Sequence, residues 1–118
     1  MLIRADDLPE VVEPSNDLVM RALVGARDSD NALSVTWVRL SGRHRRLRSD
    51  RSTRVYYIIE GAATFAVGGD EPVEARRGDA VVIPRAIPYE LWGETEYLVV
   101  NSPAFLEGDD LYDDTVGI

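Results

Sequence analysis

The side chains best suited to chemistry in this sequence are arginines, and they are concentrated in one short segment. Seven of them lie from position 39 to position 54 beside a single acid, Asp50, which gives this segment a net charge of +6. The whole chain carries −8, which leaves −14 for all other residues. A guanidinium group is a permanently charged planar fork that matches carboxylates and phosphates. The pattern therefore predicts chemistry that binds or stabilises negative charge. The seven residues are Arg39, Arg43, Arg45, Arg46, Arg48, Arg51 and Arg54.

Other reactive groups are scarce, and their absence excludes several classes of site. The chain has no cysteine, which excludes a disulfide framework, cysteine-ligated zinc or iron–sulfur clusters, and thiol catalysis. Its single histidine, His44, lies among the arginines, where we expect a solvated side chain rather than a metal ligand.

Net charge and patterning also limit the partners and the location. A net charge of −8 argues against binding to nucleic acid or to an anionic membrane, and no basic recognition helix follows a helix-turn-helix pattern. No apolar run approaches the roughly 20 residues that span a bilayer, and the first residues lack the basic-then-apolar order of a signal peptide. We therefore expect a cytoplasmic protein.

The elements that must position these side chains are short strands. Runs that favour β-structure alternate with turn residues about every ten residues, which predicts an antiparallel sandwich or barrel. No segment has the period of a long amphipathic helix. The predicted strands are 18–24, 33–40, 55–59, 62–67, 73–75, 80–83, 89–92 and 97–100.

The length of 118 residues is sufficient for a single domain. We expect its core to span about residues 18–106. Residues 1–17 are predicted to form an extended N-terminal arm that pairs at a sheet edge. Residues 107–118 contain five acids and no base, and they are expected to form a mobile or loosely docked acidic tail.

Two stretches resemble the motifs of the cupin superfamily. Val55-Tyr56-Tyr57-Ile58-Ile59-Glu60-Gly61 is similar to the end of cupin motif one, and the segment from Gly78 to Tyr89 is similar to motif two. With the hairpin between them and the stretch that follows, the resemblance covers about residues 33–106. It implies an all-β, single-domain double-stranded β-helix, or jelly-roll, barrel. Cupin activities are diverse, so the resemblance alone does not identify a reaction.

The sequence departs from the family where many cupins bind a metal. When motif one is aligned on its glycines, Arg48 and Asp50 stand at its two histidines and Arg54 at its glutamate, and Tyr89 stands at the histidine of motif two. Guanidinium groups offer no lone pair and would repel a divalent cation. Asp50 and Tyr89 alone do not make a site for a first-row metal. This departure from the family pattern therefore implies a barrel that binds no metal and uses no cofactor.

The same alignment directs Arg48 and Arg54 into the barrel. A buried arginine needs a counter-charge, which Asp50 could supply to one of them, while the other would suit a carboxylate, phosphate or enolate of a ligand. Because residues two apart in a strand share a face, an inward Arg54 implies an inward Tyr56 and Ile58. Nearby guanidinium groups should lower the pKa of tyrosines in the pocket.

We assign catalytic roles on this basis. Arg48 and Arg54 are predicted to bind substrate and stabilise developing negative charge. Asp50 is the candidate base, and Tyr89 or Tyr56 is the candidate acid.

A second group of residues is ambiguous. Trp37 and Arg39 share one strand face and are candidate substrate-binding residues. The sequence leaves open which face of this strand lines the barrel, and whether Trp37 binds a ligand or is only a core residue. Four further arginines are expected to decorate an exposed loop and to pair with acidic surface: Arg43, Arg45, Arg46 and Arg51.

These features together predict a metal-independent isomerase, lyase or cyclase that acts on a small anionic or polyketide-like molecule. The alternatives are a non-catalytic sensor or carrier that binds a metabolite, and an inactive structural homologue. The resemblance also implies a homodimer. Apolar residues of the N-terminal arm should be buried in its interface, because open sheet edges are a liability. These residues are Leu2, Ile3, Leu8, Val11 and Val12.

Overall fold

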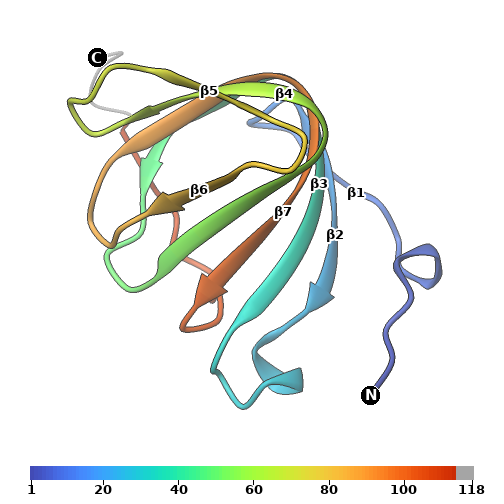
Figure 1. Ribbon diagram of the computed structural model, residues 1–118. Helices are drawn as coiled ribbons and strands as arrows, with labels where there is room; N and C mark the ends of the chain where they lie inside the picture. Colours follow the sequence, from blue (N-terminus) through green and yellow to red (C-terminus); the bar gives the residue numbers. More distant parts are fainter. Residues whose placement is uncertain (114–118) are drawn as a thin grey trace.

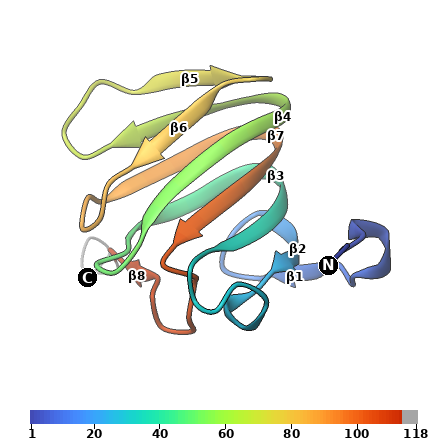
Figure 2. The same ribbon diagram turned by 60° about the horizontal axis from the view of Figure 1, so that its bottom comes forward.

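Turn residues and β-branched runs divide the described chain, residues 1–113 of this computed structural model, into eight strands and two short 3₁₀ helices. All strand pairs are antiparallel, in the order β1-β2-β3-β7-β4-β5, with β6 paired to β4 and β8 paired to β3. The sheet curls round on itself into a barrel (Figures 1 and 2). The elements are η1 (Ala5–Asp7), β1 (Val11–Glu13), β2 (Leu18–Val24), η2 (Ala26–Asp28), β3 (Ser34–Arg48), β4 (Thr53–Val67), β5 (Val73–Arg76), β6 (Ala80–Ile83), β7 (Tyr89–Ser102) and β8 (Leu111–Tyr112).

Three long strands form the frame of the barrel, where the sequence predicted shorter separate ones. β3, β4 and β7 run through Gly42, Gly61 and Gly93, which lie at bends rather than at turns between strands. Gly61 has a φ of +75°, and a Cβ atom there would lie 2.1 Å from the carbonyl oxygen of Glu94. The bends therefore need a residue without a side chain, and they allow long strands to curl into a closed wall.

The inner face follows the alternation of each strand, with one register shift each in β2, β3 and β4. Inward residues of β7 keep a strict period of two, from Tyr89 through Leu91 to Tyr97. In β3 the register shifts between His44 and Leu47, and both of these residues are buried. The shift is a β-bulge, which exchanges the inward and outward positions beyond it.

The described part of the C-terminal segment is docked on β3. Leu111 and Tyr112 form β8, which pairs with Arg48 and Leu47 of β3. The backbone N–H of Asp113 donates to the carbonyl oxygen of Arg46 at 3.0 Å. Residues 111–113 are therefore paired with β3 over a short stretch, and the loose docking of the tail remains a prediction. The rest of the predicted tail, residues 114–118, lies outside the described residues.

The N-terminal arm pairs at the sheet edge as predicted, because β1 forms a ladder with β2. Its apolar side chains Leu2 and Val12 are 74% and 68% exposed in the single chain. The homodimer remains a prediction that would cover them.

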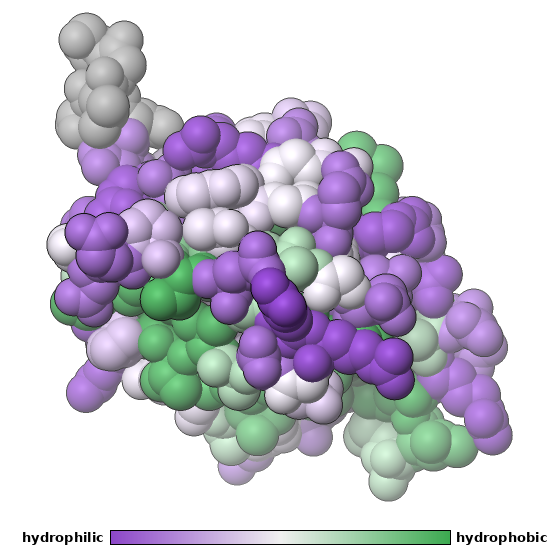
Figure 3. Space-filling model, turned by 45° about the horizontal axis from the view of Figure 1, so that its top comes forward, coloured by the Kyte–Doolittle hydropathy of each residue, from purple (hydrophilic) through white to green (hydrophobic). Residues whose placement is uncertain are grey.

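The outer surface is mainly polar. Hydrophilic residues cover most of the face in Figure 3, with smaller apolar patches between them. Residues 1–113 contain no helix of the length and hydropathy that crossing a bilayer requires. Three of the four arginines that were expected on a loop, Arg43, Arg45 and Arg46, lie instead on strand β3.

Candidate active site

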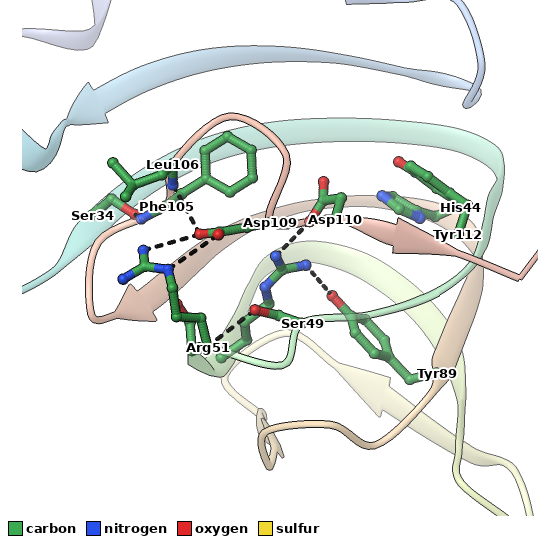
Figure 4. A network of polar contacts seen from close by, with 12 residues as sticks. Ser34, His44, Ser49, Arg51, Tyr89, Phe105, Leu106, Asp109, Asp110 and Tyr112 are labelled. Carbon is green, nitrogen blue, oxygen red and sulfur yellow. Dashed lines mark hydrogen bonds and ion pairs between the residues drawn. The ribbon is translucent and has the colours of Figure 1, made fainter.

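Arg54 is the centre of a polar cluster inside the barrel. It lies on the inner face of β4 and is only 4% exposed. Its Nη1 donates a hydrogen bond to Tyr89 Oη at 2.9 Å, and its Nη2 donates to the carboxylate of Asp110 (Figure 4). Its Nε is buried and has no hydrogen-bond partner among the described residues. The guanidinium is therefore neutralised by one acid and retains one donor without an acceptor.

Two tyrosines extend this cluster. The hydroxyl oxygens of Tyr89 and Tyr56 lie 2.6 Å apart, and both side chains are buried. The ring of Tyr56 also packs against Tyr97 and Phe65, with centroids 5.1 and 5.2 Å away. A chain of polar groups thus runs from Arg54 through Tyr89 to Tyr56 within an aromatic surround. This chain can donate hydrogen bonds to an oxygen that gains charge.

The cluster is assembled across the barrel rather than along one ladder. Tyr89 pairs with Val67 at the end of β4, whereas Arg54 lies near the start of the same strand. In a straight strand the 13 steps between positions 54 and 67 would span roughly 40 Å. The bends at the glycines curl the sheet so that Tyr89 meets Arg54 from the opposite wall. The fold is therefore a condition for the site.

His44 belongs to the same interior, which the sequence analysis did not predict. It lies on the inner face of β3 and is buried. The charge of Asp110 favours its protonated form, and the charge of Arg54 disfavours it. Its Nδ1 lies 2.9 Å from the carbonyl oxygen of Arg45. Because a carbonyl can only accept, Nδ1 carries the proton and the lone pair is on Nε2. Burial, aided by the charge of Arg54, lowers the pKa of His44, so the imidazole is neutral at neutral pH.

The mouth of the cluster is closed by the C-terminal segment. Asp110 binds Arg54, and the ring of Tyr112 stacks on His44 with an interplanar angle of 16° and centroids 6.2 Å apart (Figure 4). Tyr112 Oη accepts a hydrogen bond from Asn16 Nδ2 at 3.0 Å. Asp109 holds the segment from outside by accepting two hydrogen bonds from Arg51, at 3.1 and 3.0 Å.

The tyrosine pKa values differ from the sequence-based expectation. Burial raises the pKa of Tyr89 above its usual value, although Arg54 acts in the opposite direction. Burial also raises the pKa of Tyr56 and of Tyr97, with Tyr89 adding to both shifts. Desolvation therefore outweighs the guanidinium, and these phenols stay protonated at neutral pH. They can donate hydrogen bonds or protons and cannot act as bases.

Arg54 remains charged in this environment. Burial by itself would lower the pKa of its guanidinium, but Tyr89, Tyr56 and Asp110 outweigh burial and raise that pKa.

Of the predicted site residues, Arg54, Tyr56 and Tyr89 meet inside the barrel, whereas Arg48 and Asp50 do not. Arg48 Nε donates to Asp50 Oδ1 at 2.9 Å on the surface, where the two side chains are 43% and 55% exposed. The bulge in β3 is the reason, because it turns Leu47 inward and Arg48 outward. The assignment of Arg48 to the pocket and of Asp50 as base is therefore wrong.

Trp37 and Arg39 also lie outside the interior. Val38 and Leu40 are the buried residues of that stretch of β3, so the face that Trp37 and Arg39 share is the outer one. There the guanidinium of Arg39 lies 5.5 Å from the centre of the Trp37 ring. Their assignment as substrate-binding residues of the barrel is not supported.

The site contains two residues that were not predicted, His44 and Asp110. The sequence carries a signal for each of them. Counting in twos along β3 from Val38 and Leu40 reaches position 44, which places the imidazole on the inner face. The excess of acids in the C-terminal segment complements the arginine-rich segment, although charge alone does not identify which pair forms.

The interior does not fit the metal that the family resemblance brings to mind. No group of three His, Asp or Glu side chains among residues 1–113 is arranged to hold an ion. Where a cation would sit, the site offers a guanidinium and protonated phenols; its usual ligands are His44 and Asp110, and the Asp110 carboxylate is already paired with Arg54. The donor set therefore suits an anion or a developing negative charge better than a cation.

Access to the cluster requires movement. A shallow groove of about 400 Å³ lies over the bends of the long strands, but none of the cluster residues lines it. The residues that line it are Arg39, Leu40, Ser41, Glu60, Gly61, Glu94, Thr95 and Glu96. Since Tyr56 and Tyr89 are at most 3% exposed, a ligand reaches them only if a covering segment moves.

Solved structures of known proteins share this architecture. Pac13, a nucleoside dehydratase, superposes with a TM-score of 0.82 at 19% sequence identity, over 95% of this chain and 89% of that chain. Two tyrosine-to-phenylalanine variants and one histidine-to-glutamine variant of Pac13 from Streptomyces, each solved with uridine, give TM-scores of 0.81–0.82. KdgF from Halomonas sp. gives a TM-score of 0.77 at 18% identity, over 89% of this chain and 96% of that chain.

A variant of oxalate decarboxylase from Bacillus subtilis gives a TM-score of 0.78 at 20% identity, over 92% of this chain and 31% of that larger one. No protein-family profile matches the sequence, and no curated protein sequence matches it significantly. At such identities the likeness concerns the fold alone.

Proposed function

We propose that this chain, which has the cupin fold, is a small-molecule lyase that uses acid–base and electrostatic catalysis in place of a metal. Its substrate would be an oxygenated metabolite that bears a negative charge or develops one as an enolate. The observation that carries the proposal is a buried neutral imidazole beside the Arg54–Tyr89–Tyr56 chain in an interior that excludes water. The similarity in fold to Pac13, itself a dehydratase, supports elimination over isomerisation or cyclisation.

The roles follow from the proton inventory. His44 Nε2 takes the proton from the carbon beside a carbonyl, and the electron pair of that C–H bond moves onto the carbonyl oxygen. Arg54 and a phenol stabilise the resulting enolate, which is the charge that a preorganised cationic donor stabilises most. The enolate then re-forms its carbonyl, its C=C electron pair moves to form the Cα=Cβ bond, and the electron pair of the β C–O bond leaves on the oxygen. Tyr89 protonates the departing oxygen, and water leaves.

Tyr89 is suited to that last step because it is protonated and touches Arg54. Burial keeps the Tyr89 hydroxyl protonated in the resting site. It transfers its proton as the C–O bond breaks, and Arg54 stabilises the phenolate that remains. Proton transfer from His44 back to Tyr89 restores the starting state. Asp50 has no part in this sequence, because it lies on the surface with Arg48.

A second candidate function is binding without turnover. It is favoured by the contact of Arg54 with Tyr89 and of Tyr89 with Tyr56, since burial raises the pKa of both phenols and keeps them protonated, so that they would hold an anion without any proton transfer. A sensor or carrier would release the ligand unchanged, so the two functions differ in one measurable product.

The test is a screen of β-hydroxy carbonyl compounds, hydroxy acids and nucleosides, followed by mass spectrometry for the loss of water. We expect turnover by the wild type and a fall in kcat/KM of about 10²- to 10⁴-fold for His44→Gln, the usual contribution of a general base. Tyr57→Phe is the matched control, because Tyr57 is on the outer face of β4.

Tight binding of a ligand that is recovered unchanged would favour the sensor or carrier. Turnover that His44→Gln leaves intact would remove His44 from the mechanism.

A further inference from the structure

The C-terminal segment places two of its own side chains in the candidate active site. Asp110 supplies the carboxylate on Arg54, and Tyr112 supplies the ring stacked on His44. Both come from the short segment that includes β8. They contact Arg54 and His44, the two side chains that act on the substrate in the proposed function (Figure 4).

We propose that residues 109–112 are a displaceable internal ligand, and that the natural ligand joins an acidic group to a planar ring and replaces Asp110 and Tyr112 on binding. This rests on the proposed function only for the location of the site. It adds the chemical class of the ligand and the movement that admits it.

The way Asp110 binds leaves room for a better anion. One carboxylate oxygen contacts Nη2 of Arg54, while the buried Nε has no acceptor. A buried donor without a partner destabilises the folded state. A carboxylate or phosphate that bound Nε and Nη2 together would satisfy both donors in the bidentate geometry that guanidinium groups prefer. Asp110 thus neutralises the charge of Arg54 but leaves its Nε donor without an acceptor.

The ring position is equally replaceable. Tyr112 is half-buried and packs against the edge of the apolar core. Its polar and ring contacts include the stack on His44, the hydrogen bond from Asn16 and the guanidinium of Arg45 at 4.0 Å from the ring centre. A planar face between an imidazole and a guanidinium suits any aromatic or heterocyclic ring. No residue in this contact recognises anything peculiar to tyrosine except the hydroxyl that meets Asn16.

The attachment of the segment is suited to release. β8 is two residues long and lies at the end of the described chain. Asp109, just before it, accepts two hydrogen bonds from Arg51, whose side chain is 42% exposed. Short, partly exposed pairings of this kind belong to the low-stability end of a fold. When the segment lifts, Asp110 exchanges Arg54 for water, so no buried acid is left unpaired.

The binding experiment uses two probes that differ only in charge: 3-(4-hydroxyphenyl)propanoate and its amide, 3-(4-hydroxyphenyl)propanamide. Titration calorimetry on the full chain gives the dissociation constant of each probe. Asp110→Ala is expected to bind the acid at least tenfold more tightly than the wild type, with the amide changed less than threefold. Glu107→Gln is the matched control, since it removes one negative charge from an exposed position of the same segment.

A second variant and a wild-type measurement guard against misfolding of Asp110→Ala. Tyr112→Ala keeps Asp110 on Arg54 and should tighten binding of both probes. In the wild type, hydrogen exchange at residues 110–113 should accelerate when the acid saturates the protein, because the bond from Asp113 to the Arg46 carbonyl opens.

The proposal is overturned if the acid binds Asp110→Ala no better than Glu107→Gln, or if it binds the wild type with unchanged exchange in residues 110–113. Neither measurement requires turnover. Charge-selective binding of these probes, together with no turnover in the screen of hydroxy compounds, would therefore refute the proposed lyase and leave the internal ligand standing. Turnover without charge-selective binding would do the reverse.

Discussion

Replacing Tyr89 with phenylalanine should destabilise the protein far more than the same change at its partner Tyr56. Tyr89 Oη takes part in two hydrogen bonds in an interior that water does not reach, one from the Arg54 guanidinium and one with Tyr56. Tyr56→Phe removes only the second. Since Phe keeps the ring, packing is preserved and the difference reports the bond to Arg54.

The expected magnitudes follow from these two contacts. A hydrogen bond to a charged group contributes about 1.5–3 kcal/mol and a neutral one about 1 kcal/mol. Tyr89→Phe should therefore lower the free energy of unfolding by about 3 kcal/mol, and Tyr56→Phe by about 1 kcal/mol. The double variant should cost about as much as Tyr89→Phe alone, because both changes remove the same shared bond.

Urea denaturation followed by tryptophan fluorescence measures these differences. For a domain of this size, with a slope of about 1.5 kcal/mol per molar urea, a loss of 3 kcal/mol moves the midpoint by about 2 M. Tyr57→Phe on the exposed outer face is the control, with an expected change within about 0.5 kcal/mol. Equal losses for Tyr89→Phe and Tyr56→Phe would show that the contact between Arg54 and Tyr89 does not stabilise the fold.

Three further predictions concern protonation, packing and composition. The one histidine gives a single set of ring resonances, and NMR titration should place the pKa of His44 below 6.5, because burial disfavours the imidazolium. As pH falls through 6.5 the unfolded chain binds that proton first, so stability is full above 6.5 and declines toward the folded pKa; a folded pKa of 6.5 or more would contradict this. Gly61→Ala should lose about 1–3 kcal/mol more than Gly78→Ala in the same urea assay, since both have positive φ but only Gly61 meets backbone atoms; equal losses would contradict the close approach. Elemental analysis should find far less than one equivalent of iron, manganese, nickel or zinc, and one equivalent would overturn the donor-set argument.

The fold and part of the site could be predicted from local alternation. The runs of β-favouring residues predicted the strands, and the motif resemblance predicted the barrel that the fold comparison confirms. Counting in twos correctly placed Tyr56 and Ile58 on the face of Arg54, and Leu91 on the face of Tyr89. These inferences succeed because a pleated strand repeats every two residues wherever its ladder is unbroken.

The errors arise where that repeat breaks or where distant segments meet. The bulge in β3 brings His44 and Leu47 to the same face three positions apart, so an alignment that assumes even spacing puts Arg48 inside. The arginine-rich stretch was interpreted as a loop, which hid the inward position of His44. The pairing of Asp110 with Arg54 joins positions 56 residues apart, and no periodicity encodes it.

The contacts of Tyr89 have a structural consequence beyond the site. One phenol oxygen links β7 to Arg54 and Tyr56 of β4, although neither of these residues is its partner in the ladder between the two strands. These contacts hold the two strands together, and any natural enlargement of the interior has to break them first. Across relatives of this chain, the size of guest that the barrel admits and the melting temperature of the empty protein should therefore vary in opposite directions.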